Sequence, residues 1–183
     1  LQAGITDYCL TPTLLGKGNF AKVFQGKKLS CNLDVAIKVI RTTRKKSNER
    51  LPRKYLDLEI KILKTLKSDN IVTLIDSFAV DKYQFLILEY CNSGDLKHFL
   101  QRNAVFTGLP EATVRDFMQQ ISSALQTMQS HRVIHRDLKL ENILVNSDDK
   151  HRIPRLKIAD FGLAKFLEEE NLIQTHCGTP IYE

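Results

Sequence analysis

The sequence predicts an α+β fold in which a strand-rich first half precedes a helix-rich second half. Up to about residue 90, most apolar runs are short, rich in β-branched and aromatic residues, and bounded by Gly, Asn, Asp or Ser, which is typical of strands. From Asp95 onward the apolar residues recur at helical spacing. This division of the chain indicates an α+β arrangement.

Five strands and one helix are expected in the first half. The strands are predicted at residues 10–15, 21–26, 35–40, 71–78 and 85–90, and they suggest an antiparallel sheet. Residues 52–66 are predicted to be helical, because Leu56, Ile60 and Leu63 follow helical spacing and a proline at position 52 is accepted in a first turn. Glu59 then lies on the apolar face of this helix.

Helices dominate the second half. Asp95 is the expected N-cap of a helix at residues 96–101, and a longer helix is expected at 111–130. The apolar stripe of the longer helix predicts core packing and comprises Val114, Phe117, Met118, Ile121, Leu125 and Met128. Short strands are predicted at 143–145 and 156–158 around a polar loop. The change of pattern divides the chain into a first lobe at 1–90, a hinge at 91–94 and a second lobe at 95–183.

Composition restricts the classes of partner and compartment. No apolar run approaches the roughly 18 residues that a membrane span needs. The net charge of +6 comes largely from residues 41–54, where aromatic residues are not interleaved, so we expect a solvated face and no nucleic-acid partner. The four scattered cysteines favour neither a zinc site nor a disulfide framework, which indicates a reducing compartment, the cytosol or the nucleus; we expect a cytoplasmic protein.

Two glycines and a buried lysine are the first candidates for chemistry. Gly16 and Gly18 lie between two predicted strands, where backbone amides can approach a phosphate, although such a pair is more often a plain turn. A dinucleotide fingerprint would need a helix after this loop, and a strand follows instead. Lys38 lies within a strand that is expected to be buried, so we predict that it pairs with Glu59; the alternative is that each side chain extends to solvent.

Residues 135–142 combine the groups that phosphoryl transfer requires. Asp137 can orient an attacking hydroxyl, Lys139 can neutralise the transferring charge, and Asn142 can bind magnesium. Asp160 offers a second oxygen ligand after another short strand. A charged surface turn is the alternative, but it does not account for the strand-like run that follows at 143–145.

These motifs, in this order, resemble the eukaryotic protein kinase family. The resemblance implies a two-lobed fold, with an antiparallel N-lobe sheet and its αC helix, and ATP and Mg²⁺ as cofactors. It implies that Asp137, Lys139 and Asn142 are catalytic, and that Asn142 and Asp160 hold the metal. The residues that it implies for nucleotide binding are Leu15, Gly16, Lys17, Gly18, Asn19, Phe20, Ala21, Val23, Ala36, Lys38, Glu59, Leu88, Glu89, Cys91, Asp95 and Leu144.

Within these, Ala21 stands where the family usually has a third glycine. By resemblance, Leu88 is the gatekeeper, Glu89 and Cys91 bind the base through their backbone, and Asp95 meets the ribose. Leu63, Leu74, His135 and Phe161 resemble the apolar column that joins the lobes of active kinases. An outward swing of Glu59 would break this column together with the Lys38 pair.

Serine/threonine specificity is implied by Lys139 and by the run Gly178-Thr179-Pro180. A protein Ser/Thr substrate is therefore the expected partner. Arg136 resembles the arginine that binds an activation-loop phosphate, and Thr175 is the expected acceptor, through an activating kinase or autophosphorylation. The stretches at 20–26 and 89–96 resemble the autophagy-initiating serine/threonine kinases; calcium/calmodulin-dependent and polo-type kinases share parts of the pattern.

The last residues depart from the family pattern, because Glu183 follows Tyr182 directly. We therefore expect a C-terminally truncated kinase fragment in which only the first half of the helical C-lobe is present, and in which the helix at 111–130 exposes an apolar face. The alternative function is a non-catalytic fragment that binds ATP or a partner protein.

Overall fold

The computed structural model describes residues 7–18, 21–42, 53–103, 108–147 and 153–167. These residues form two compact units. The first comprises the described residues up to Ile60 together with Thr73–Tyr90, and the second comprises Lys61–Val72 and the described residues from Cys91 onward. The predicted hinge at 91–94 thus belongs to the second unit. No helix of the described residues is long and apolar enough to cross a membrane.

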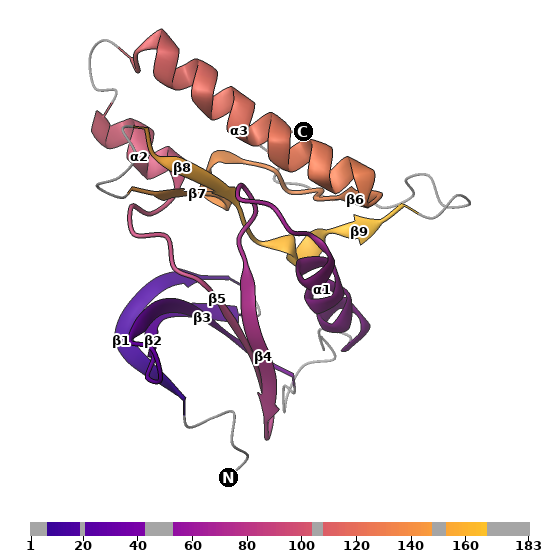
Figure 1. Ribbon diagram of the computed structural model, residues 1–183. Helices are drawn as coiled ribbons and strands as arrows, with labels where there is room; N and C mark the ends of the chain where they lie inside the picture. Colours follow the sequence, from indigo (N-terminus) through magenta and orange to yellow (C-terminus); the bar gives the residue numbers. More distant parts are fainter. Residues whose placement is uncertain (1–6, 19–20, 43–52, 104–107, 148–152, 168–183) are drawn as a thin grey trace. The chain divides into compact units, whose positions relative to one another are not determined.

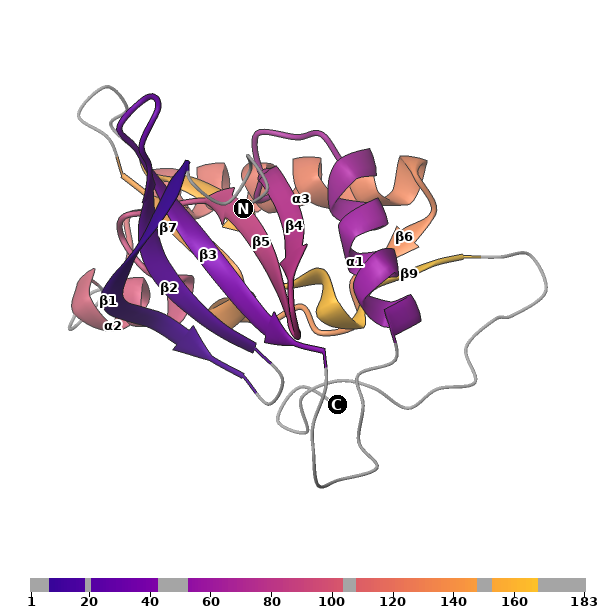
Figure 2. The ribbon, with the colours of Figure 1, turned by 90° about the horizontal axis from the view of Figure 1, so that it is seen from below.

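A five-stranded antiparallel sheet forms the first unit, with the strand order β1-β2-β3-β5-β4 (Figure 2). The strands are β1 (Tyr8–Lys17), β2 (Ala21–Lys28), β3 (Leu33–Arg41), β4 (Leu74–Val80) and β5 (Tyr83–Glu89). Helix α1 (Arg53–Thr65) begins in this unit and its last residues belong to the second. The predicted antiparallel sheet is confirmed, and each strand lies close to its predicted position.

The sheet curls, because the two strands at its edges approach each other. Tyr8 on β1 stacks on the ring of Phe78 on β4 at a centroid distance of 5.9 Å, and its hydroxyl donates to Asp76 Oδ2 at 3.3 Å. Burial and the neighbouring Asp76 carboxylate raise the pKa of Tyr8 to about 12. Inside the curl, Val35, Ile37 and Ile87 are buried and form a core cluster of this unit.

One strand was predicted too long at its start. Residues 71–78 were expected to be one strand, yet β4 begins at Leu74. Ile71 instead forms a parallel bridge with Ile158 in the second unit, to which both residues belong. Val72 N donates to Ile158 O at 2.9 Å, and Ile158 N donates to Asn70 O at 2.8 Å. The apolar run is therefore shared between two sheets, and periodicity alone does not reveal such a division.

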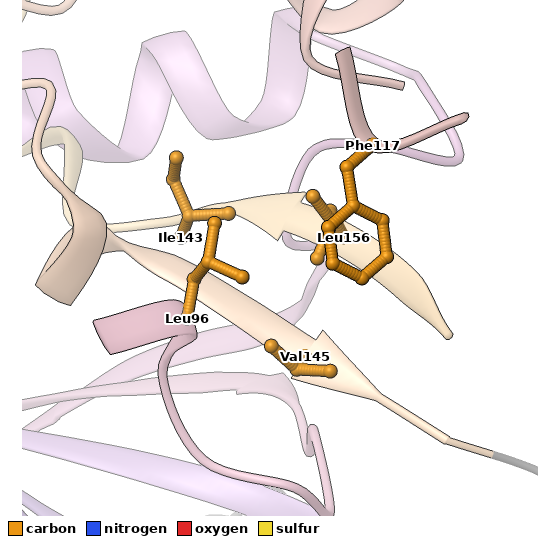
Figure 3. Packing of buried hydrophobic residues seen from close by; sticks show 5 residues of the cluster. All are labelled: Leu96, Phe117, Ile143, Val145 and Leu156. Carbon is orange, nitrogen blue, oxygen red and sulfur yellow. The ribbon is translucent and has the colours of Figure 1, made fainter. Parts of the chain in front are cut away.

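The second unit contains two helices and short strands. Its elements are α2 (Leu96–Asn103), α3 (Glu111–Ser130), β6 (Val133–Ile134), η1 (Leu140–Asn142), β7 (Ile143–Asn146), β8 (Arg155–Ile158), η2 (Phe161–Leu163) and β9 (Lys165–Phe166). Strands β7 and β8 form a hairpin, and β6 pairs with β9 (Figure 1). Phe117 on α3 packs on this hairpin with Leu96, Ile143, Val145 and Leu156 (Figure 3).

The apolar stripe of α3 is only half buried. Of the predicted stripe, Phe117 and Met128 are buried and Ile121 is partly buried, whereas Val114, Met118 and Leu125 are exposed by 44%, 58% and 39%. The two sets lie on adjacent faces of the helix, since Met118 follows the buried Phe117 by one position and Leu125 follows the buried Ala124 by one position. The prediction of core packing was therefore right for one half of the stripe, and the expected exposed apolar face is the other half.

Position 26 on β2 requires glycine because the neighbouring atoms leave no space for a Cβ, and not because of its backbone angles. A Cβ at this position would meet Ile37 Cδ1 and would lie 2.8 Å from Cys9 O, which is part of the β1 backbone. We predict that Gly26→Ala destabilises the first unit by about 1–3 kcal/mol, because β1 must shift. Urea unfolding tests this, with Gly16→Ala as control, since a Cβ there meets nothing within 4 Å. Equal unfolding midpoints for the two variants would contradict the prediction.

Candidate active site

Lys38 and Glu59 form a buried ion pair in the first unit. Lys38 lies on β3 opposite Val23 and Leu86, and Glu59 lies on α1. Lys38 Nζ is 2.6 Å from Glu59 Oε1, and the two side chains are only 12% and 6% exposed. The predicted pairing is confirmed, and the alternative in which each side chain extends to solvent is wrong.

The β1–β2 hairpin carries the glycines. Gly18 N donates to Ala21 O at 2.9 Å, which closes the turn, whereas Asn19 and Phe20 lie outside the described residues. Gly16 pairs with Val23, and Lys17 pairs with Lys22. A Cβ at Gly16 would have open space around it, with nothing within 4 Å. Leu15, just before Gly16, is 42% exposed.

The other apolar candidates of the first unit lie on neighbouring strands. Ala36 on β3 is buried and lies opposite Leu88 on β5. Leu88 in turn lies opposite Leu74 on β4. Glu89 N donates to Thr73 O at 2.9 Å, which fixes the end of β5. The sheet therefore brings Val23, Ala36 and Leu88 onto three adjacent strands.

Asp137, Lys139 and Asn142 form one hydrogen-bonded cluster in the second unit. Lys139 Nζ lies 2.9 Å from Asp137 Oδ2 and 3.2 Å from Oδ1. Asn142 Nδ2 donates to Asp137 Oδ2 at 2.9 Å and to Asp137 O at 2.8 Å. The carboxylate is thus held in a fixed orientation by a cation and an amide, which is how a group that must accept a proton is positioned.

A backbone hydrogen bond connects the residue before Asp160 to this cluster. Ala159 N donates to Asn142 O at 2.8 Å, so the residue before Asp160 is bound to Asn142. Asp160 is exposed and left-handed, with φ 59° and ψ 72°, an uncommon conformation for a residue other than glycine. Because Asn142 Nδ2 donates to the Asp137 carboxylate, the side-chain oxygen of Asn142, Oδ1, points away from that carboxylate. Asn142 Oδ1 and the Asp160 carboxylate are hard oxygen donors, which fit Mg²⁺.

His135 connects this cluster to the residues around Asp160. It is 3% exposed, its Nε2 lies 2.9 Å from Ala159 O, and its ring meets Phe161 edge-on at 4.9 Å. Asp137 N donates to His135 Nδ1 at 3.3 Å, so Nδ1 is the acceptor and Nε2 carries the proton. This is the neutral form, and burial lowers the pKa of His135 below its ordinary value of 6.5.

The buried neutral histidine predicts a pH dependence of stability. The pKa of His135 is lower in the folded state, so the folded state binds this proton less readily than the unfolded state does. The contribution of neutral His135 to the free energy of unfolding is therefore complete above pH 6.5, and it is lost as pH falls below 6.5 toward the lowered pKa. Through this one group, the free energy of unfolding cannot change by more than about 1.4 kcal/mol per pH unit. We expect wild type to lose more stability than His135→Phe between pH 7.5 and 5.5 in urea unfolding. The same loss in both proteins would contradict the role of His135.

One contact of the predicted apolar column lies within the second unit. Leu63, His135 and Phe161 are all buried there, and His135 contacts Phe161 directly. Leu74 is buried in the first unit, so the complete column stays a prediction. Arg136, at φ 66°, donates from Nε to Leu163 O at 2.7 Å. Thr175 and the run Gly178-Thr179-Pro180 lie outside the described residues.

The residues after β5 carry contacts that sequence reasoning missed. Asp95 caps α2 as predicted, since His98 N donates to Asp95 Oδ1 at 2.9 Å, but Asp95 Oδ2 is also 2.6 Å from His98 Nδ1. Leu144 lies opposite Asp95 in an antiparallel bridge. Lys97 Nζ lies 2.7 Å from Glu141 Oε1, and this hydrogen bond lowers the pKa of Glu141. The i, i+3 spacing of Asp95 and His98 was the only available signal.

Comparison with known proteins agrees with this geometry. The family model for the protein kinase domain matches residues 11–183. The chain is 42% identical over 174 residues to human serine/threonine-protein kinase ULK1, covering 92% of this chain and 16% of that protein. It is 40% identical over 178 residues to serine/threonine-protein kinase ATG1a of Arabidopsis thaliana, covering 97% and 27%.

A third relative is serine/threonine-protein kinase atg1 of Schizosaccharomyces pombe, which is 34% identical over 199 residues, with 92% of this chain and 24% of that protein covered. The chain thus spans 16% to 27% of the length of these relatives. With the family model matched over nearly its whole length and the predicted motifs in order, the chain belongs to the protein kinase domain family.

Proposed function

We propose that the protein is an ATP-dependent serine/threonine protein kinase that transfers the γ-phosphate of ATP to serine or threonine hydroxyls of protein substrates. The observation that carries this proposal is the Asp137 carboxylate, held between Lys139 and Asn142 at 2.9 Å from each. Oriented in this way, it can accept the proton of an attacking hydroxyl. The relatives' serine/threonine specificity supports the choice of acceptor.

The transfer step uses the second unit's cluster. The substrate hydroxyl oxygen bonds to the γ-phosphorus, the bond from that phosphorus to the bridging oxygen breaks, and ADP leaves, while the hydroxyl proton passes to Asp137. Lys139, already in contact with Asp137, neutralises charge on the transferring group. Asn142 and Asp160 would hold Mg²⁺, which neutralises phosphate charge when bound.

The first unit would hold the phosphates of ATP. Lys38 Nζ is kept in place by Glu59, and an ammonium so positioned can also bind phosphate oxygens. The glycine hairpin would cover the phosphates with its backbone amides. The proposed phosphate-binding residues of the hairpin are Leu15, Gly16, Lys17, Gly18, Asn19, Phe20 and Ala21.

The base and ribose would be bound by apolar side chains and backbone groups. We assign binding of the adenine base to the side chains of Val23, Ala36, Leu88 and Leu144. Backbone groups of Glu89 and Cys91 would form hydrogen bonds with it. We assign the ribose to Asp95, whose carboxylate is already fixed by His98. A cytoplasmic location, and activation by phosphorylation of Thr175, are part of the same proposal.

A non-catalytic role is the second candidate, and the exposed half of the α3 stripe is the observation that favours it. The test measures Mg·ATP binding by calorimetry and transfer of labelled γ-phosphate to a generic protein substrate, followed by phosphoamino-acid analysis. Labelled phosphoserine or phosphothreonine is the expected product. Binding of Mg·ATP without transfer would favour the non-catalytic role, and absence of Mg·ATP binding would overturn the kinase proposal and leave only the binding of a partner protein.

A further inference from the structure

Residues 91–95, here called the linker segment, run beside β7 like an added strand. Ser93 N donates to Val145 O at 3.0 Å, and Val145 N donates to Gly94 O at 2.8 Å. Asp95 lies opposite Leu144 in an antiparallel bridge. All of these residues belong to the second unit. The segment that the sequence suggests to be a hinge is therefore bonded to the β7–β8 hairpin.

Asn92 extends this pairing with its side chain. Its Nδ2 donates to Ser147 O at 2.6 Å, and its Oδ1 accepts from Ser147 N at 2.9 Å. Ser93 and Gly94 both bond to Val145, so the pairing has a bulge there and position 92 falls opposite position 146, one residue before Ser147. A primary amide offers both a donor and an acceptor, as a peptide unit does. The Asn92 amide thus makes with the Ser147 backbone the two hydrogen bonds that a peptide unit would make just beyond the end of the ladder.

Further contacts hold the same residues. Asn92 N donates to Asn146 Oδ1 at 3.4 Å, and Ser93 Oγ donates to Asn92 Oδ1 at 2.9 Å. Arg102 on α2 donates from Nη2 to Ser93 O at 2.8 Å. Gly94, with φ +77°, lets the chain turn from this ladder into the N-cap of α2. The linker segment is therefore held from the β7 side and from the α2 side.

We propose that Asn92 is a positioning residue for nucleotide recognition. By clamping the linker segment to Ser147, it fixes the backbone of the adjacent Cys91, which is buried and is the group proposed above to bind the base. A backbone donor or acceptor discriminates between two bases only when its position is fixed, because a mobile group can adapt to either base. This inference rests on the proposed function, and it assigns to Asn92 the selectivity for adenine over other bases.

The experiment compares Mg·ATP with Mg·GTP, which differ only in the base. Dissociation constants are measured by calorimetry for wild type, Asn92→Ala and Asn92→Asp. Both variants lose the hydrogen bond to Ser147 O. Asn103→Ala is the matched control, because Asn103 is an exposed asparagine whose amide donates to Phe99 O within α2. Hydrogen exchange of the Ser147 amide reports the clamp itself.

Both Asn92 variants are expected to bind Mg·ATP about fivefold more weakly, the size expected for losing one or two exposed hydrogen bonds, and Mg·GTP unchanged within twofold. Ser147 should exchange faster in Asn92→Ala and at the wild-type rate in Asn103→Ala. Unchanged Mg·ATP affinity, or an equal loss for both nucleotides, would overturn the inference, since the latter indicates a purely structural role. Failure of wild type to bind Mg·ATP would overturn the proposed function instead.

Discussion

Asp137→Asn is expected to lower the rate of γ-phosphate transfer by about 10²- to 10⁴-fold while changing Mg·ATP affinity by less than about threefold. Asparagine has the same shape as aspartate, so the side chain can still occupy the position between Lys139 and Asn142. An amide cannot accept the hydroxyl proton, and therefore only the chemical step loses its base. Single-turnover transfer of labelled phosphate, with binding measured separately, distinguishes the two effects.

Asp34→Asn is the matched control for this variant. Asp34 is on β3, and its side chain is half exposed, with Lys27 Nζ 3.5 Å away. The charge change is identical and lies outside the proposed catalytic cluster, so transfer should stay at the wild-type rate. If Asp137→Asn turned over as fast as Asp34→Asn, Asp137 would not be the base, and the proposed mechanism would fail.

Lys38→Met is expected to destabilise the first unit by about 3–5 kcal/mol, a large part of the stability of an ordinary domain. The replacement removes the cation and leaves the Glu59 carboxylate, only 6% exposed, buried without it. Replacing both residues, as in Lys38→Met/Glu59→Leu, removes both charges and should recover most of the loss. Urea unfolding of the single and double variants measures the coupling between the two residues.

The exposed pair of Lys27 and Asp34 provides the comparison. Their side chains are 41% and 50% exposed, and solvent screens the interaction. Lys27→Met should therefore cost less than about 1 kcal/mol. A similar cost for Lys27→Met and Lys38→Met, or a double variant as unstable as Lys38→Met alone, would show that burial of the Lys38–Glu59 pair does not control stability.

Much of the fold could be predicted because its signals are local. Short β-branched runs located the sheet, and helical spacing located α1 and α3 to within a few residues. The pairing of Lys38 with Glu59 followed from one physical requirement, that two charges on apolar faces need partners. Strands β6 and β9 were missed, because two-residue strands are too short to show any periodicity.

Other features were missed because they depend on residues far apart in the chain. Asn92 and Ser147 are 55 positions apart, and nothing near either residue reveals the amide clamp. Ile71 continues an apolar run yet pairs with Ile158 rather than joining β4. The α3 stripe indicates which residues are apolar, but the β7–β8 hairpin covers Phe117 and not Met118.

The sequence by itself determined which groups are available for the proposed chemistry, since the acid, the cations and the amide of the motif at 135–142 are fixed by residue type and spacing. The tertiary structure alone decided how these groups are oriented. Asp137 is held by Lys139 and Asn142, and His135 is neutral because burial disfavours its charged form. The reason is that residue types and local spacing specify which groups are available, whereas desolvation and long-range hydrogen bonds arise only when distant segments pack together.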